Sequence, residues 1–208
     1  MAGLRLLLSL LAPPRCVGCG GPCELGSLLC SRCERLLAAL PPEIGAPPPG
    51  VDQVWSAAPH DGLARALVAA LKFRAQLPVA GLAAERIALL APRDLLDGAI
   101  VPVPPAPSRS RRRGFDPAAC LAHELAGRTG IQLVACLRRA SGPRQVGRPR
   151  SSRLADPPRI SVNGDPVPGR AVLVDDVMTT GATLAACAAA LRAAGAAQVS
   201  ALTFARTA

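Results

Sequence analysis

The chain is poor in aromatic residues: its 208 residues include no tyrosine, one tryptophan and three phenylalanines. This scarcity weakens any model in which nucleic acid binds by stacking its bases on aromatic rings. A basic groove remains compatible with the composition, because 24 lysines plus arginines face 14 aspartates plus glutamates, a formal net charge of +10.

Long apolar runs are also missing. A membrane-spanning helix needs about 20 apolar residues, and arginine, aspartate or proline interrupts every candidate stretch. Residues 1–12 imitate a secretion signal, but their apolar part is short, Pro13 and Pro14 follow it, and no small-x-small cleavage site appears. We therefore expect a cytoplasmic protein without stable membrane insertion, whose first residues form a short apolar helix.

The chain nevertheless has enough apolar residues for a core, since half of them are hydrophobic and 18% are charged. Proline and glycine concentrate in residues 41–50, which we interpret as a semi-rigid linker. The predicted organisation is an N-terminal helix and cysteine module at 1–40, this linker at 41–50, and a larger domain at 51–208.

Apolar spacing in the larger domain predicts an α/β fold. It indicates helices over 63–72, 79–90, 117–130 and 183–194. Compact apolar segments predict strands over 99–101, 171–174 and 199–204, and 131–137 could form another, while most of 138–168 is expected to be loop. The closely spaced strand, helix and strand near the C-terminus favour a parallel sheet flanked by helices.

Five of the eight cysteines lie within a short N-terminal stretch. Cys16 and Cys19 form one C-x-x-C pair, and Cys30 and Cys33 form a second pair after ten intervening residues. Four thiolates at this spacing fit a closed tetrahedral Zn²⁺ site with a structural role. Disulfides or a redox pair are the alternative, and Cys23 could replace one of the four ligands.

Residues 172–183, V-L-V-D-D-V-M-T-T-G-A-T, combine an apolar strand, two acids, a hydroxyl-rich turn and a helix start. Asp175 and Asp176 can accept hydrogen bonds from two neighbouring hydroxyls of a ribose. The helix start and its threonines can bind a phosphate, and Gly181 allows close approach of the backbone. Alternatively, the acids ligate a metal or shape a turn and Thr183 only caps the helix. The order of the residues favours a ribose 5-phosphate site.

This stretch closely resembles the motif with which type I phosphoribosyltransferases bind 5-phosphoribosyl-1-pyrophosphate (PRPP). Together with the cysteine module, the chain resembles the ComF family of competence-associated, phosphoribosyltransferase-like proteins. The likeness also includes Asp61-Gly62-Leu63, Leu71-Lys72-Phe73, Val101-Pro102-Val103-Pro104, Arg113-Gly114-Phe115 and Gln145. It implies that 51–208 is a type I phosphoribosyltransferase-like domain with a parallel sheet flanked by helices.

The resemblance also implies a binding site. Its PRPP-binding residues would be Asp175, Asp176, Val177, Met178, Thr179, Thr180, Gly181, Ala182 and Thr183. Lys72, Arg113 and the loop that contains Val103 would contact the pyrophosphate, and Mg²⁺ would bridge it to the ribose hydroxyls. In an enzyme, a nitrogen nucleophile would attack C1 of the ribose as pyrophosphate leaves. The catalytic residues are unknown, because the sequence shows no convincing general base.

Some positions do not follow the family pattern. Asp116 and Pro117 stand where relatives often have Asn-Gln, and His60 stands where they often have tyrosine. A common Arg-x-x-Asn element begins here at Arg153 but has Asp156 in place of the asparagine. These departures lie outside the phosphate-binding turn, so they affect the inherited acceptor and turnover more than PRPP binding. We interpret His60 and His123, the two histidines, as structural or surface residues.

Positive charge is concentrated from Arg109 to Arg153, where eleven arginines face only Asp116 and Glu124. This segment could be a solvated loop or could bind a nucleic-acid backbone. Two functions follow. One is a protein that transfers or senses a phosphoribosyl group and acts in DNA uptake during natural competence. The other is a non-catalytic uptake or processing factor that holds single-stranded DNA and works with the uptake machinery.

Overall fold

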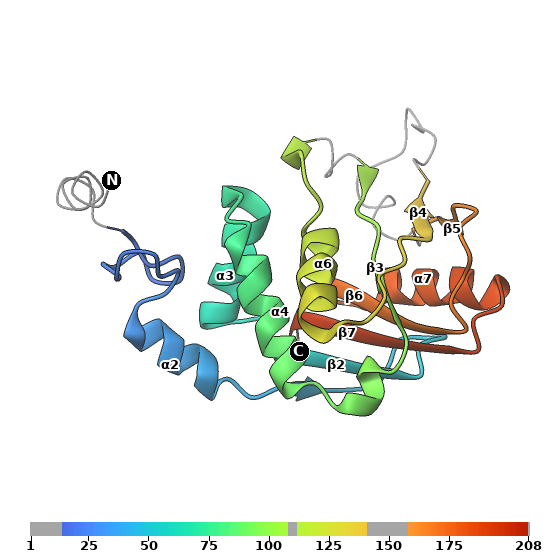
Figure 1. Cartoon of the computed structure of the whole chain (residues 1–208), viewed down its shortest axis with the longest axis horizontal. Helices are drawn as coiled ribbons and strands as arrows, with labels where there is room; N and C mark the ends of the chain where they lie inside the picture. The colour runs from blue at the N-terminus through green and yellow to red at the C-terminus, as the bar shows by residue number, and fades with distance from the viewer. Residues whose placement is uncertain (1–13, 108–111, 141–157, 208) are drawn as a thin grey trace.

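The computed structural model describes residues 14–107, 112–140 and 158–207. Its centre is a five-stranded sheet in the order β1-β2-β7-β6-β3 (Figure 1). The strands are β1 (Glu43–Ile44), β2 (Gln53–Pro59), β3 (Ala99–Pro102), β6 (Arg170–Met178) and β7 (Gln198–Arg206). Neighbouring strands are parallel except β1, which pairs antiparallel with β2. The predicted parallel α/β sheet is confirmed.

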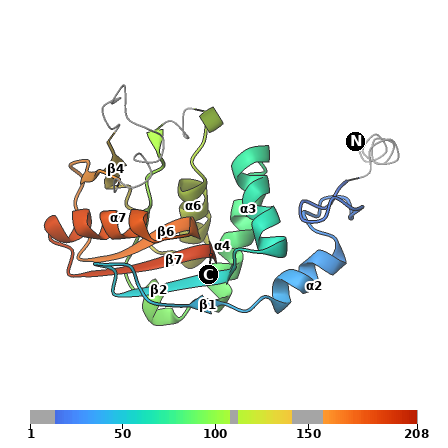
Figure 2. The same cartoon turned by 180° about the vertical axis from the view of Figure 1, so that it is seen from behind.

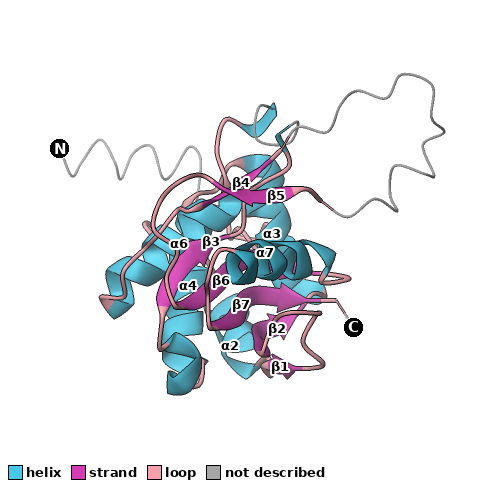
Figure 3. Cartoon of the chain, turned by 90° about the vertical axis from the view of Figure 1, so that its right-hand side faces the viewer, coloured by secondary structure: helices cyan, strands magenta, loops and turns pink. Residues whose placement is uncertain are grey.

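Helices cover both faces of the sheet (Figure 3). They are α3 (Gly62–Arg74), α4 (Pro78–Leu90) and α6 (Pro117–Thr129) on one face and α7 (Ala182–Ala193) on the other. Side chains alternate along a strand, so Val172 and Val174 of β6 pack with the first three helices, while Ala171 and Leu173 pack with α7. Burial on both faces explains the continuous apolar run with which β6 begins. No described helix is long and apolar enough to cross a membrane.

Some elements have no clear signal in the sequence. β2 is buried continuously from Val54 to Ala58, and this run includes Ser56, whose hydroxyl lies 2.7 Å from that of Thr203 in β7. Because Ser56 is polar, apolar spacing alone does not predict this strand. The α2 helix (Ser31–Ala39) and the 3₁₀ helix η1 (Arg93–Leu96) are also additions.

The prediction of a strand over 131–137 is wrong. Leu133 forms only an isolated parallel bridge with Ile100, whose amide donates to the carbonyl of Gln132 and whose carbonyl accepts from the amide of Val134. The chain thus crosses the edge of β3 and pairs with it at a single point. Farther on, β4 (Leu137–Arg139) and β5 (Ile160–Val162) form a small antiparallel pair inside the segment expected to be loop.

The cysteine module packs against α3 (Figure 2). Nη2 of Arg74 donates to the carbonyl of Val17 at 3.0 Å, and a Cβ on Gly18 would lie 2.4 Å from Cδ1 of Leu63. Cys16 belongs to the same buried cluster as the α3 core residues. In the linker, residues 43 and 44 form the edge strand β1. The division at 1–40, 41–50 and 51–208 stays a prediction, and the N-terminal helix expected over 1–12 lies outside the described residues.

Candidate functional site

A pocket of about 470 Å³ lies at the carboxyl edge of the parallel sheet. His60 follows β2 directly, Val103 follows β3, and Asp175 and Asp176 lie in the last residues of β6; all four line the pocket. The carboxyl ends of parallel strands meet at one edge, where open α/β sheets bind their ligands. The fold therefore gathers polar groups from distant parts of the chain around one space.

The two hollows at this edge contain every residue predicted to bind PRPP. The pocket takes in Lys72, Val103, Arg113, Asp175, Asp176, Val177, Thr179 and Thr183. A smaller hollow of about 40 Å³ is lined by Asp175, Val177, Met178, Thr179, Thr180, Gly181, Ala182, Thr183 and Leu184. Because the two share lining residues, they adjoin.

The acidic pair lies within β6 and not after it. The strand continues to Met178 and stays in register with β7, where Asp175 faces Thr203. On its other side, β3 ends at Pro102, opposite Val174. The end of β6 therefore extends beyond β3, and the pocket reaches the strand there.

Strand alternation sends the two acids toward opposite faces of the sheet. Asp176 has the same parity as Val174 and forms an ion pair with Lys72 of α3, with 2.8 Å between Nζ and Oδ1. Oδ2 of Asp176 is buried and has no hydrogen-bond partner among the described residues. Since buried polar atoms are rarely left unpaired, this oxygen is a ready acceptor for a ligand hydroxyl.

Asp175 lies on the α7 side and is half-buried, and its Oδ1 accepts a hydrogen bond of 2.8 Å from the amide of Asp176. Burial raises the pKa of Asp175 well above its usual range, and the neighbouring Asp176 carboxylate adds to this effect. Lys72 opposes the shift without cancelling it. A donor from a ligand would stabilise the ionised form.

The turn from β6 to α7 has the hydroxyls and helix start that phosphate binding requires. Oγ1 of Thr180 accepts from the amide of Ala182 at 3.4 Å, and the first-turn amides of a helix have no partner within the helix. Gly181 has a φ of +74°, and a Cβ there would lie 2.6 Å from Cγ of Pro48. Its need for glycine is thus explained by the backbone and by Pro48, without a ligand.

The loop after β3 has few free backbone amides. The amide of Val103 donates to the carbonyl of Val174 at 3.0 Å, and the side chain is buried. Pro102, Pro104 and Pro105 have no amide hydrogen. On this side of the pocket, Lys72 offers a cationic side chain to an anion.

The pocket also contains side chains that the sequence does not single out as ligand contacts, namely His60, Arg65, Phe73, Asp116 and Arg139. Arg65 lies seven residues before Lys72, a helical spacing that places both on one side of α3. Asp116 caps α6, accepting from the amide of Ala118 at 3.0 Å. A cap before Pro117 is a recognisable signal, but nothing in it points to the pocket.

Two of these groups have shifted pKa values. Burial raises the pKa of Asp116, and the negative charge of the nearby Asp176 raises it further. Burial lowers the pKa of His60, and the positive charges of Lys72 and Arg65 lower it further. The side chain of His60, interpreted from the sequence as structural or surface, lines the pocket. His123 is exposed on α6.

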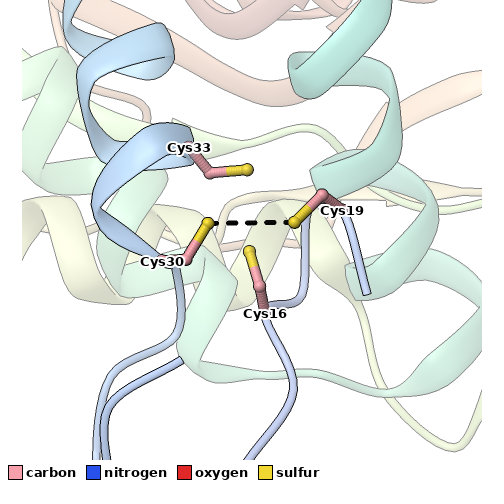
Figure 4. A group of neighbouring side chains, drawn as sticks. All are labelled: Cys16, Cys19, Cys30 and Cys33. Atoms are coloured by element: carbon pink, nitrogen blue, oxygen red, sulfur yellow. Dashed lines mark hydrogen bonds between the residues drawn. The ribbon is translucent and has the colours of Figure 1, made fainter. Parts of the chain in front are cut away.

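The four predicted cysteines form a second site (Figure 4). The sulfur atoms of Cys16, Cys19, Cys30 and Cys33 all lie within 4.8 Å of one another, and those of Cys19 and Cys30 are 3.8 Å apart. A tetrahedron with Zn–S bonds of about 2.3 Å has S···S edges of about 3.8 Å. The cluster therefore has the size that a zinc ion requires.

The thiols of the module differ in pKa, since burial and hydrogen bonds with the neighbouring cysteines raise the pKa of Cys33 to about 12, whereas the pKa of Cys16 is lowered. Burial acts to raise the pKa of Cys16, but the backbone amides of Cys19, Cys30 and Gly18 outweigh it and lower the pKa to about 6. Cys23 lies apart from the cluster, with its Sγ donating to the carbonyl of Ser27 at 3.4 Å. All eight cysteines are among the described residues and none forms a disulfide. Four cysteines held in this way could bind a zinc ion.

Cys33→Ser should reduce the metal content of the purified protein from about one zinc per chain to nearly none, because three thiolates and a hydroxyl hold zinc poorly. Cys23→Ser is the matched control and should keep its zinc. Elemental analysis by plasma mass spectrometry measures both. Zinc retained by the Cys33 variant, or lost from the Cys23 variant, would contradict the assignment of ligands.

Asp175→Asn should stabilise the protein at neutral pH and have a much smaller effect in acid. The folded pKa of Asp175 lies above its unfolded value, so the unfolded chain releases this proton first. Stability is consequently lost as pH rises from about 4 toward the folded pKa. Urea unfolding from pH 4 to 8 measures the difference, with the exposed Asp94→Asn as control. A gain from Asp175→Asn that does not change with pH would be the contrary result.

Comparison with known proteins gives a distant structural likeness. No protein-family model matches the chain, and no curated protein matches it. Among solved structures it is similar to a purine phosphoribosyltransferase from Pyrococcus horikoshii Ot3, with 22% identity, coverage of 64% of this chain and 83% of that chain, and a TM-score of 0.36. The nature of the ligand therefore has to be inferred from the residues of this chain.

Proposed function

We propose that the pocket binds PRPP along the carboxyl edge of β6. The observation that supports this most strongly is the meeting of two different chemistries in adjoining hollows. The larger hollow combines Asp175 and Asp176 with the cations of Lys72 and Arg113. The smaller one is lined by the hydroxyl-rich turn at the start of α7. A ribose with a phosphate at one end and a pyrophosphate at the other needs these groups in this order.

In the proposed complex, the start of α7 and its threonine hydroxyls bind the 5-phosphate. The carboxylates of Asp175 and Asp176 accept hydrogen bonds from the ribose hydroxyls, and the unpaired Oδ2 of Asp176 is suited to this role. Lys72 and Arg113 face the pyrophosphate. Nε of Arg113 is itself buried without an acceptor among the described residues, so an anion here would satisfy it.

Mg²⁺ would partly neutralise the pyrophosphate. Among the described residues, the cysteine cluster is the only group of three or more cysteine, histidine or acidic side chains close enough to share an ion. A Mg²⁺ ion in the pocket would therefore take most of its oxygen ligands from PRPP and water. The ion would then enter the pocket together with PRPP. The zinc ion would hold the cysteine module together and take no part in this chemistry.

The consequence of binding is either transfer or sensing. Transfer breaks the bond between C1 of the ribose and the pyrophosphate oxygen, which leaves with the electron pair, and forms a C1–N bond to a nitrogenous acceptor. Positioning and charge stabilisation would supply most of the acceleration. A sensor would bind PRPP without turnover. Release of pyrophosphate in the presence of a panel of bases separates the two.

The resemblance to the ComF family adds a cellular role in DNA uptake by a cytoplasmic protein, which stays a proposal. The alternative, a factor that binds single-stranded DNA, depends on the basic segment that begins at Arg109. The described arginines of that segment are Arg112, Arg113, Arg128, Arg138 and Arg139, and much of the remainder, including Gln145 and Arg153, lies outside the described residues. Loss of DNA binding on neutralising these arginines, with a smaller salt dependence, would favour this alternative.

Calorimetry with PRPP and Mg²⁺ tests the proposed site, and simpler ligands divide it into its two parts. Thr183→Val should weaken PRPP and ribose 5-phosphate by about tenfold and leave inorganic pyrophosphate unchanged, because it removes a donor to the 5-phosphate. Arg113→Met should weaken PRPP and pyrophosphate by a similar factor and spare ribose 5-phosphate. Asp175→Ala should abolish PRPP binding.

Thr129→Val is a suitable control for these titrations. Its hydroxyl donates to the carbonyl of Leu125 at the end of α6 remote from the pocket, so all three affinities should stay as in the wild type. No heat from PRPP with the wild-type protein, or equal losses for all ligands in every variant, would overturn the proposed site.

A further inference from the structure

Phe73 is much more exposed than the other aromatic side chains of the protein. Trp55 and Phe204 are each 2% exposed, and Phe115 packs against the core, whereas Phe73 is 67% exposed at the end of α3. Exposing an aromatic ring forfeits the apolar burial that usually stabilises it. The fold therefore gives no reason for an aromatic residue at this position.

The ring has one specific partner. The guanidinium carbon of Arg113 lies 5.2 Å from the centre of the Phe73 ring, within the range of a cation–π contact. Both residues line the pocket, although they are forty positions apart in the sequence. The contact thus joins the last turn of α3 to the segment that precedes α6.

The local chain does little else to fix Arg113. It is flanked by Gly114, which has a φ of +75°, and its Nε is buried without an acceptor among the described residues. A long side chain with an unpaired donor needs a support if it is to hold one direction. The face of Phe73 provides such a support and leaves the N–H groups, which lie in the guanidinium plane, available to a ligand.

We propose that Phe73 is a positioning residue that holds the Arg113 guanidinium in the orientation needed for the pyrophosphate group. The inference rests on the proposed function, since it takes PRPP as the ligand. The ring acts through Arg113 and does not touch the ligand. Neighbouring residues of α3 then serve the two charged parts of the pocket, because Lys72 pairs with Asp176 while Phe73 supports Arg113.

A double-mutant cycle tests this role, with inorganic pyrophosphate and PRPP as probes in the presence of Mg²⁺. Phe73→Leu keeps apolar bulk without the π face and should weaken both probes about three- to fivefold. Phe73→Tyr keeps the face and should bind like the wild type. In an Arg113→Met background, Phe73→Leu should cause no further loss, because the residue through which it acts is gone.

Several results would overturn the inference. Unchanged affinity in Phe73→Leu would show that the ring is dispensable. An equal loss in the presence and absence of Arg113 would show that the ring contacts the ligand directly or acts through the fold. If Phe73→Tyr weakened binding as much as Phe73→Leu does, a role for the π face would be excluded. If the wild-type protein binds neither probe, the proposed function itself fails.

A measurement without ligand tests the contact between Phe73 and Arg113 independently of whether the protein binds PRPP. The ring current of Phe73 should shift the Nε–H resonance of Arg113 in the wild-type protein, and Phe73→Leu should remove that shift. Thermal unfolding should be nearly the same in the two proteins, because the ring is mostly exposed. An Arg113 signal that does not respond to Phe73→Leu would contradict the contact whether or not PRPP is the ligand.

Discussion

The structure depends on the placement of β6 between two parallel neighbours with helices on both faces. This position requires an apolar strand for as long as both neighbours and both helical layers cover it. Where β3 stops at Pro102, β6 is free to carry polar side chains, and Asp175 and Asp176 follow at once. Burial around them is still sufficient to raise the pKa of Asp175. The polar pocket is thus a consequence of strands of unequal length.

The last turn of α3 connects the parts of the molecule. Three successive residues make three different long-range contacts: Lys72 pairs with Asp176, Phe73 lies under Arg113, and Arg74 binds the carbonyl of Val17. The cysteine module therefore touches the helix that supplies two pocket residues. A metal that stabilises the module would also stabilise this end of α3, which gives a structural zinc ion a physical connection to the site without a role in chemistry.

Much of the fold and of the candidate site can be predicted from local sequence patterns. The parts that depend on contacts between distant segments cannot. The cysteine tetrad and the β6–α7 stretch are contiguous motifs, and the structure brings together the residues that each motif predicts. The sequence does not predict β2, because Ser56 interrupts its apolar residues. The hydrogen bond that allows Ser56 to be buried comes from Thr203, which is distant in the sequence. The partners of Asp176 and Phe73 come from distant segments, so only the folded chain reveals them. The bond from the amide of Val103 to the carbonyl of Val174 is likewise a contact between distant segments, which only the folded chain reveals.

The central claim is that one ribose ligand spans the two hollows beside β6. A crystal structure of the protein with PRPP and Mg²⁺ tests it most directly. We predict density for the 5-phosphate at the start of α7, with the ribose hydroxyls on Asp175 and Asp176. A complex in which PRPP lies elsewhere, with Asp176 still bound only to Lys72 and no density in either hollow, would contradict the account.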